Sequence, residues 1–259
     1  MKRYIVANWK MNMLPAQAMK FLDKFDELSP TNYQNVQTVI APPFVDLPQM
    51  KERTVGNRIE LAAQNISEFD QGTYTGEISG PLLRGFVEYS LVGHSERRQI
   101  LQEKDHSIAK KVAAALRNNI RPILCVGDDL HQRQEGLSKL VIVNQLESSL
   151  SEITAEDLPS ILVAYEPIWA ISKGDGRAPT PTPDDISEMN LHIRKILSDL
   201  FGAKAAAKPP ILYGGSANPD NTTAILKSQE ISGLLIGGAS LKVDQFVAMI
   251  DKAHNLPEN

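Results

Sequence analysis

Three polar residues with complementary chemistry, Lys10, His94 and Glu166, each come shortly after a run of apolar residues. A lysine ammonium and an imidazole can together polarise a carbonyl group, which acidifies the proton on the neighbouring carbon. A carboxylate held beside them can remove that proton. If the fold brings the three together, the trio predicts general acid–base chemistry on a carbonyl compound.

Each of these residues also has a plainer interpretation. A glutamate at the rim of a fold is by default a partner in a surface salt bridge, and most histidines are surface or satisfied core residues. Glu166 differs because Pro167 follows it. A proline favours an extended backbone at the residue before it, so the Glu166 carboxylate is held on a rigid segment. His94 differs from the other histidines because it stands in a turn after an apolar run and before an expected helix start. The positive end of a helix there favours a neutral ring.

Two glycine turns indicate a second kind of site. Gly214-Gly215-Ser216 and Gly237-Gly238 each follow an apolar run and precede an expected helix start. Backbone N–H groups would be exposed there without an intervening side chain, which suits an anion. One such turn alone is more often a tight connection. Two of them after neighbouring strands favour a phosphate pocket.

The apolar runs themselves are the strands that must position these groups. Most are continuous and do not alternate with polar residues, which is typical of strands buried on both faces of a parallel sheet. The eight expected strands are Arg3–Ala7, Val36–Ala41, Ile59–Ala63, Tyr89–Val92, Pro122–Val126, Ile161–Tyr165, Ile211–Tyr213 and Leu234–Ile236. In a parallel barrel the carboxyl ends of all strands meet on one rim, so the polar groups would converge.

The segments between these strands carry apolar residues at helical spacing. The expected helices are Ala16–Leu28, Leu47–Arg53, His106–Asn118, Leu137–Leu150, Asp184–Phe201, Pro219–Lys227 and Val243–Ala253. Asn218 before Pro219 predicts a helix start at that proline, and Pro183 before two aspartates predicts another. Only the third crossover, near Pro81–Gly85, is expected to be short.

Eight strand–helix units without a linker or a composition shift predict a single domain, a closed eight-stranded parallel (β/α)8 barrel over residues 1–259. An open doubly wound sheet normally has fewer strands and often a nucleotide-binding fingerprint after the first. The sequence has neither that fingerprint nor the phosphate-binding loop of nucleotide hydrolases. It also lacks a nucleophile elbow, because Arg97 stands where the second glycine is needed.

Composition excludes several function classes. The 259 residues are 42% hydrophobic with a net charge of −4, which is typical of a globular protein and argues against nucleic acid as a partner. The sequence has no run of about 18 apolar residues and no leader-like start, so we expect a cytoplasmic protein without a membrane partner. The single cysteine, Cys125, allows no internal disulfide and is predicted to be a core thiol.

Five separated motifs resemble those of the triosephosphate isomerase family, in the family's order. They are Asn8-Trp9-Lys10-Met11-Asn12, Gly93-His94-Ser95-Glu96-Arg97-Arg98, Tyr165-Glu166-Pro167-Ile168-Trp169-Ala170, Tyr213-Gly214-Gly215-Ser216 and Gly237-Gly238-Ala239-Ser240-Leu241. The resemblance covers nearly the whole chain and implies a TIM barrel. The implied reaction is the interconversion of dihydroxyacetone phosphate and D-glyceraldehyde 3-phosphate through an enediol(ate), in glycolysis and gluconeogenesis.

The resemblance also implies a role for particular residues. The implied catalytic residues are Glu166 as the base, His94 as a neutral electrophile, Lys10 as a cationic stabiliser and Asn8 as an oxyanion donor, with Glu96 supporting them. The phosphate is implied to bind near Ser172, Ser216, Gly237 and Gly238. No metal ion and no organic cofactor are expected. The implied partner is a second copy of the chain, reached through the loop Gln71–Glu77 with Thr75 near its tip.

The segment Trp169–Pro181 is the longest irregular stretch on the predicted rim and is interpreted as a lid, although a merely long loop has the same composition. It also departs from the family pattern, because Ile171-Ser172-Lys173-Gly174-Asp175 replaces the usual Ile-Gly-Thr-Gly-Lys and a longer link follows. Two alternative functions stay open at this point. One is another phosphosugar enzyme such as an epimerase, and the other is a catalytically idle phosphate-binding scaffold barrel.

Overall fold

Eight parallel strands pair in chain order, and the last pairs with the first, so the sheet closes into a barrel. The computed structural model describes residues 2–29, 33–54, 58–171 and 181–257. The strands are β1 (Arg3–Asn8), β2 (Val36–Ala41), β3 (Ile59–Ala63), β4 (Tyr89–Val92), β5 (Arg121–Val126), β6 (Leu162–Tyr165), β7 (Ile211–Tyr213) and β8 (Gly233–Ile236). All eight predicted strands are therefore confirmed, with ends that differ by no more than one residue.

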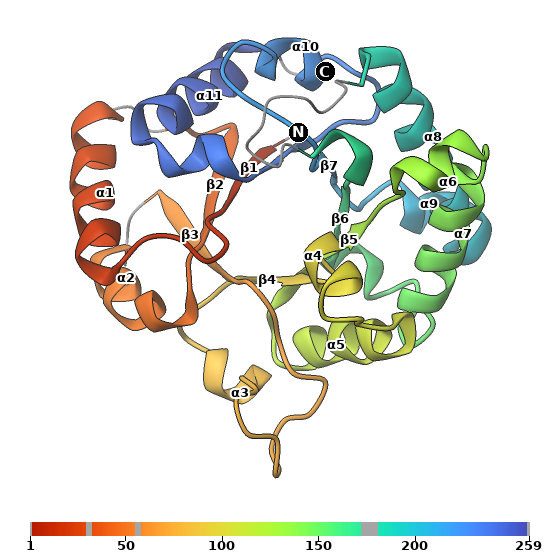
Figure 1. The fold of residues 1–259 in the computed structure, drawn as a ribbon, viewed down its shortest axis with the longest axis horizontal. Helices are drawn as coiled ribbons and strands as arrows, with labels where there is room; N and C mark the ends of the chain where they lie inside the picture. The colour runs from red at the N-terminus through yellow and green to blue at the C-terminus, as the bar shows by residue number, and fades with distance from the viewer. Residues whose placement is uncertain (1, 30–32, 55–57, 172–180, 258–259) are drawn as a thin grey trace.

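Helices surround the barrel on its outside (Figure 1). The α-helices are α1 (Pro15–Leu28), α2 (Leu47–Thr54), α3 (Gly80–Leu83), α4 (Ser95–Gln99), α5 (Asp105–Arg117), α6 (Leu130–Gln134), α7 (Ser138–Ser149), α8 (Pro183–Phe201), α9 (Ala203–Ala206), α10 (Thr222–Leu226) and α11 (Val243–Asn255). The short 3₁₀ helices are η1 (Phe44–Asp46), η2 (Leu158–Ser160), η3 (Ile168–Ala170) and η4 (Gly238–Leu241). The short third crossover is confirmed by α3, and no helix in the described part of the chain could span a membrane.

One predicted helix start was wrong. We expected a helix from Pro219 with Asn218 as its cap, but α10 begins at Thr222. The Asn218 side chain accepts hydrogen bonds from the backbone N–H groups of Asp220 and Asn221, at 2.9 and 3.2 Å. This asparagine therefore stabilises a turn that delays the helix by one turn. The predicted start at Pro183 is confirmed, with Thr182 as the cap of α8.

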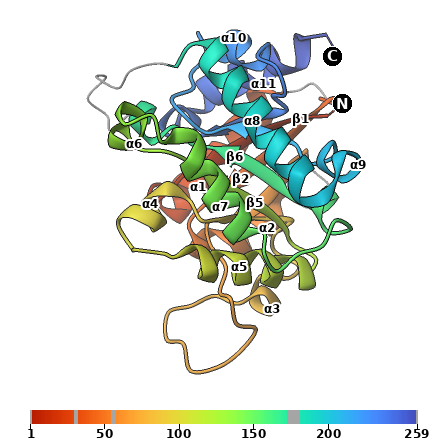
Figure 2. The ribbon, with the colours of Figure 1, turned by 90° about the vertical axis from the view of Figure 1, so that its right-hand side faces the viewer.

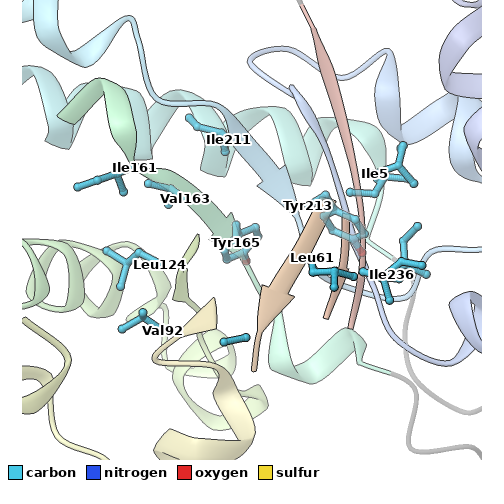
Figure 3. Packing of buried hydrophobic residues seen from close by; sticks show 14 of the residues in the cluster. Ile5, Leu61, Val92, Leu124, Ile161, Val163, Tyr165, Ile211, Tyr213 and Ile236 are labelled. Atoms are coloured by element: carbon cyan, nitrogen blue, oxygen red, sulfur yellow. The ribbon is translucent and has the colours of Figure 1, made fainter. Parts of the chain in front are cut away.

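Each strand of the barrel is buried on both faces, which explains the continuous apolar runs. In β1, Ile5 and Ala7 belong to the large apolar cluster that lies between the sheet and the helices, part of which is shown in Figure 3. Val6, between them, belongs to a second cluster, which fills the barrel interior together with residues such as Leu91 and Cys125. The alternation of side chains along a strand thus supplies two cores from one apolar sequence.

The connection from β3 to α3 leaves the body of the molecule as a protruding loop (Figure 2). Within it, Phe69 and Tyr74 stack face to face, with ring centroids 4.2 Å apart and ring planes inclined by 2°. The tip of the loop is exposed from Asp70 to Glu77. The predicted partner-binding segment, Gln71–Glu77, therefore lies in the described region and extends away from the barrel.

Candidate active site

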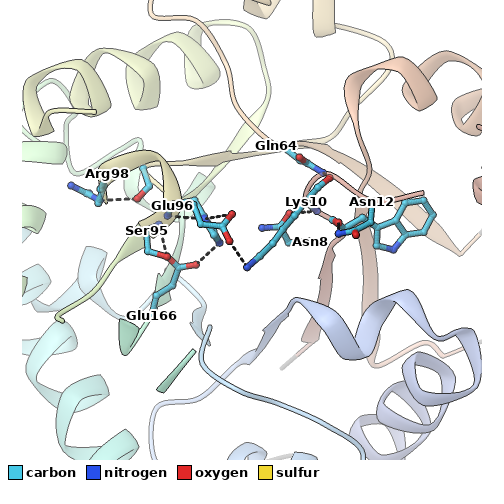
Figure 4. Close-up of polar contacts among 11 residues, drawn as sticks. Asn8, Lys10, Asn12, Gln64, Ser95, Glu96, Arg98 and Glu166 are labelled. Atoms are coloured by element: carbon cyan, nitrogen blue, oxygen red, sulfur yellow. Dashed lines mark hydrogen bonds and ion pairs between the residues drawn. The ribbon is translucent and has the colours of Figure 1, made fainter. Parts of the chain in front are cut away.

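A cavity of about 350 Å³ opens at the carboxyl end of the strands, as the order of polar residues predicted. It is lined by Asn8, Lys10, His94, Glu166, Ile171, Gly214, Gly215, Ser216, Ala217, Asn218, Leu235, Gly237, Gly238, Ala239, Lys242 and Gln245. The four predicted catalytic residues come from the ends of β1, β4 and β6 and all line this cavity. Figure 4 labels three of them, Asn8, Lys10 and Glu166, together with Glu96.

Glu166 is held after the end of β6 by contacts with the end of β5 and with the turn after β4. Its backbone N–H donates to the carbonyl oxygen of Val126 at 2.8 Å. Its side chain is only 2% exposed, with Oε2 accepting from the Ser95 N–H at 2.8 Å and Oε1 lying 3.0 Å from His94 Nε2. The carboxylate is therefore fixed by two donors that come from the same turn after β4.

Two glycines make room for this glutamate. A Cβ atom on Gly127 would lie 1.9 Å from the carbonyl oxygen of Glu166, and one on Gly214 would lie 2.9 Å from its Cγ. A Cβ on Gly215 would lie 2.2 Å from the Tyr213 hydroxyl. The Gly214-Gly215 pair thus has a packing role beside Glu166, in addition to the anion-binding role that the sequence suggested.

His94 is the cap residue of α4, which confirms the helix start predicted after this strand. Its Nδ1 accepts a hydrogen bond from the backbone N–H of Glu96 at 3.3 Å. An accepting Nδ1 carries a lone pair, so the neutral ring holds its proton on Nε2, the nitrogen that faces Glu166. The ring therefore presents an N–H donor toward the cavity.

The charges of His94 and Glu166 affect each other. Burial lowers the pKa of His94, but the negative charge and hydrogen bond of Glu166 outweigh it, so the pKa lies above its ordinary value. Burial raises the pKa of Glu166, but His94 and the Ser95 N–H outweigh it, so that pKa lies below its ordinary value. The expectation based on the helix end alone did not include the carboxylate, which acts on His94 in the opposite direction.

Lys10 adopts a backbone conformation that is rare for a residue with a side chain, with φ of +53°. Three contacts around it stabilise this conformation. Its N–H donates to Asn8 Oδ1 at 3.1 Å, and its carbonyl oxygen accepts from Gln64 Nε2 at 2.8 Å. Its ammonium lies 2.7 Å from Glu96 Oε1. Glu96 thus supports Lys10 directly, at a partly exposed position.

The predicted phosphate-binding residues are brought together only in part. Ser216, Gly237 and Gly238 line one side of the cavity, and a Cβ on Gly237 would lie 3.9 Å from Lys10 Nζ. Gly238 begins η4, where the first N–H groups have no partner within the helix. The Ser216 N–H donates to the Ala170 carbonyl oxygen at 3.3 Å, so it is engaged within the protein. Ser172, like most of the predicted lid, lies outside the described residues.

The sequence interpretation missed Asp128 and Arg98, two residues that hold the catalytic turns. Asp128 is fully buried and accepts from the Tyr165 hydroxyl at 2.8 Å, while its carbonyl oxygen accepts from the Ile168 N–H at 2.9 Å. Asp128 therefore binds the residue just before Glu166 in the chain and a residue two positions after it. Arg98 donates to the carbonyl oxygens of Gly93 and Cys125, at 2.7 and 3.1 Å. Asp128 comes two residues after the end of β5, so the strand-end criterion applied to that strand would have found it.

Cys125 lies in the barrel interior, fully buried. Burial raises the pKa of its thiol well above the ordinary value, which disfavours the thiolate. The prediction of a core thiol is confirmed.

Comparison with known proteins agrees with the resemblance seen in the sequence. A family model described as triosephosphate isomerase matches residues 3–253. The chain is 40% identical to the triosephosphate isomerase of Chlamydia muridarum over 96% of its own length and 90% of that protein. It is 39% identical to that of Caldanaerobacter subterraneus subsp. tengcongensis over 97% of its length and all of that protein. It is 40% identical to that of Carboxydothermus hydrogenoformans over 96% and 98%, respectively.

Proposed function

The chain belongs to the triosephosphate isomerase family, and we propose that Asn8, Lys10, His94 and Glu166 carry out the family's reaction in it. That reaction interconverts dihydroxyacetone phosphate and D-glyceraldehyde 3-phosphate, a step of glycolysis. It needs no external cofactor, because a proton only moves between adjacent carbons of one substrate. Each of the four groups has its own part in that transfer.

Glu166 is the base that moves this proton. Its pKa is below the ordinary value, so the carboxylate is ionised at neutral pH. Gly127 and Gly214 have no side chains, so Glu166 can pack closely against both of them. General base catalysis contributes about 10²–10⁴-fold, which is not sufficient without stabilisation of the developing charge.

His94, Lys10 and Asn8 supply that stabilisation. His94 donates its Nε2–H to the substrate oxygens, and the Lys10 ammonium attracts the negative charge that develops on them. Asn8 Oδ1 already accepts from the Lys10 N–H, which leaves its amide Nδ2 as a donor for the same oxygens. One such donor contributes roughly 10²–10³-fold to the rate.

The substrate phosphate binds at the Gly237-Gly238 side of the cavity. The N–H at the start of η4 and the nearby Lys10 ammonium support this placement. We assign Ser216 and Ser172 to the same site from the family resemblance. If Ser216 donates its N–H to the phosphate, the bond to Ala170 must break, which couples phosphate binding to the chain that follows Glu166.

The single observation that carries these assignments is the 3.0 Å approach of His94 Nε2 to Glu166 Oε1 at the base of the cavity. It supports a mechanism in which a donor and a base act together on adjacent atoms of the substrate. An idle scaffold has no need of this arrangement, so the scaffold alternative is disfavoured.

The test is Glu166→Asp in a coupled assay of glyceraldehyde 3-phosphate isomerisation. Shortening the side chain by one methylene withdraws the carboxylate and is expected to lower kcat by about 10²-fold or more. The variant is expected to stay folded with a modest fall in melting temperature, because the contacts with Ser95 and His94 are weakened. Glu156→Asp, at an exposed position, is the matched control. Turnover of Glu166→Asp near the parental rate would remove Glu166 from the role of base.

We also propose a cytoplasmic homodimer with one barrel domain per chain. The protruding loop 71–77 supports the dimer, as do exposed apolar side chains after the first, second and fourth strands: Met11 is 97% exposed, Val45 75% and Ile100 74%. Apolar side chains gathered on consecutive loops are typical of an interface between proteins. The cytoplasm is where glycolytic enzymes generally act.

A further inference from the structure

A second cavity, of about 460 Å³, lies at the other end of the barrel from Glu166. Its lining includes Lys2 and Arg3 at the start of β1, Ser232 just before β8, and parts of α8 and α9. Figure 2 shows α9 and the N-terminus on the right, opposite α4. Arg3 begins β1 and Asn8 ends it, so the two cavities are separated by the length of that strand, roughly 16 Å.

The charge of this cavity is opposite to that of the whole molecule. It is lined by three cationic side chains, Lys2, Arg3 and Arg194, and one carboxylate, Glu230. The chain as a whole has a net charge of −4. Arg3 is only 7% exposed, so its charge is poorly screened by water. A local excess of two positive charges therefore lies in a partly enclosed space.

The contacts within the protein leave most of this charge in place. Arg3 Nη1 donates to the carbonyl oxygens of Ala253 and Leu256 at 3.0 Å. Arg194 donates to the Pro209 carbonyl oxygen at 3.0 Å and through Nε to Glu230 at 2.9 Å. Carbonyl oxygens carry no net charge, so among the residues that line the cavity and are described by the structure, Glu230 alone is a carboxylate that can neutralise one of the cations.

Several hydrogen-bond donors at the cavity are unused. Among the residues that the structure describes, the Nη2 group of Arg194 has no partner, since its bonds come from Nε and Nη1. The hydroxyl groups of Ser198 and Ser232, which line the same cavity, also make no hydrogen bond within that part of the chain. The Lys2 ammonium donates once, to Gln37 at 2.6 Å.

We propose that this cavity binds a phosphate group, either as inorganic phosphate or as a small phosphate ester. A phosphate carries up to two negative charges, which match the local excess. Its oxygens accept from guanidinium, ammonium and hydroxyl donors. The cavity is larger than the one at Glu166 and lies within the range of small-molecule sites.

The test is calorimetric titration with inorganic phosphate at constant ionic strength. Ser232→Asp places a carboxylate beside the cations, so this variant is expected to bind one phosphate per chain fewer than the parent. Its kcat and KM for isomerisation are expected to be unchanged, because Ser232 is at the opposite end of the barrel. Because isomerase activity is measured on the same variant, a negative result for phosphate binding at this cavity can be told apart from a negative result for the proposed catalytic residues.

A milder pair of variants covers the case in which Ser232→Asp does not fold. Lys2→Gln removes one cavity cation, and Lys20→Gln makes the same change at an exposed site on α1. Lys2→Gln is expected to weaken the cavity phosphate by about two- to five-fold, and Lys20→Gln to leave it unchanged. Equal phosphate affinity and stoichiometry in the parent and in every folded cavity variant would overturn the proposal. A parallel titration with glycerol 1-phosphate identifies the source: tighter binding supports an ester, and weaker binding supports free phosphate.

Discussion

At the residue scale, the active site is organised around a coupled pair. Glu166 and His94 are both almost completely buried, and each makes the charged form of the other more favourable. The same contact that positions Glu166, the proposed base, therefore also contributes to the stability of the fold, in a manner that depends on pH.

The direction of each pKa shift sets this dependence. The folded pKa of Glu166 lies below its ordinary value of 4.5, so its contribution is present above pH 4.5 and is lost as the pH falls through the folded value. The folded pKa of His94 lies above its ordinary value of 6.5, so its contribution is present below pH 6.5 and is lost as the pH rises through the folded value. Both are present together between pH 4.5 and 6.5.

We therefore expect Glu166→Gln to lower the free energy of unfolding most strongly near the middle of this window. The loss is expected to be about 1.5–3 kcal/mol, the usual contribution of a hydrogen bond to a charged group, and to shrink on the alkaline side. Urea denaturation of parent and variant across pH measures it, with Glu156→Gln as the baseline for an exposed glutamate. A loss that is constant across pH would show that the two groups are not coupled.

At the element scale, most of the arrangement could be predicted because it follows from backbone geometry. Continuous apolar runs mark strands that are buried on both faces, and parallel strands place their carboxyl ends on one rim. That rule alone is enough to predict that Lys10, His94 and Glu166 converge. It would also have found Asp128, since that residue follows β5 in the same way.

Other parts of the site could not be predicted, because they depend on contacts between distant segments. The helices α6 and α9, five and four residues long, were not predicted because they are too short to show a periodic pattern. The space that Gly214 leaves for Glu166 depends on the approach of β7 to β6. The effect of Glu166 on the pKa of His94 could not be predicted either, because it depends on the distance between the side chains at two strand ends.

Asp128 gives a prediction at this scale, because it joins the β5–α6 connection to the end of β6. Asp128→Ala leaves the buried Tyr165 hydroxyl without its acceptor and is expected to lower the free energy of unfolding by about 1–3 kcal/mol. A shift of Glu166 is expected to reduce kcat about tenfold or more, with a smaller change in KM. Asp128→Asn, which keeps an acceptor oxygen, should recover much of both. Parental kcat and stability in Asp128→Ala would show that Tyr165 and Ile168 hold this turn without it.

At the scale of the whole molecule, apolar surface is concentrated on one sector of the barrel. Met11, Val45, the loop 71–77 and Ile100 follow the first four strands in order, and these strands are neighbours in the barrel. Their loops therefore lie side by side around the protruding segment. The exposed apolar side chains of this sector, on either side of the mostly polar loop 71–77, support an interface with a second copy of the chain.

The proposed homodimer makes a direct prediction about mass. In solution the parent is expected at twice the chain mass of 28.5 kDa. Thr75→Arg places a bulky charge in the exposed loop and is expected to shift the protein toward single chains, because an unpaired charge is costly to bury in an interface. Ser148→Arg, at an exposed position on α7, makes the same change away from this sector and should leave the mass at two chains. Light scattering after size-exclusion chromatography measures all three. A parent with the mass of one chain would exclude the dimer, and a Thr75→Arg variant that stays at two chains would place the interface elsewhere on the barrel.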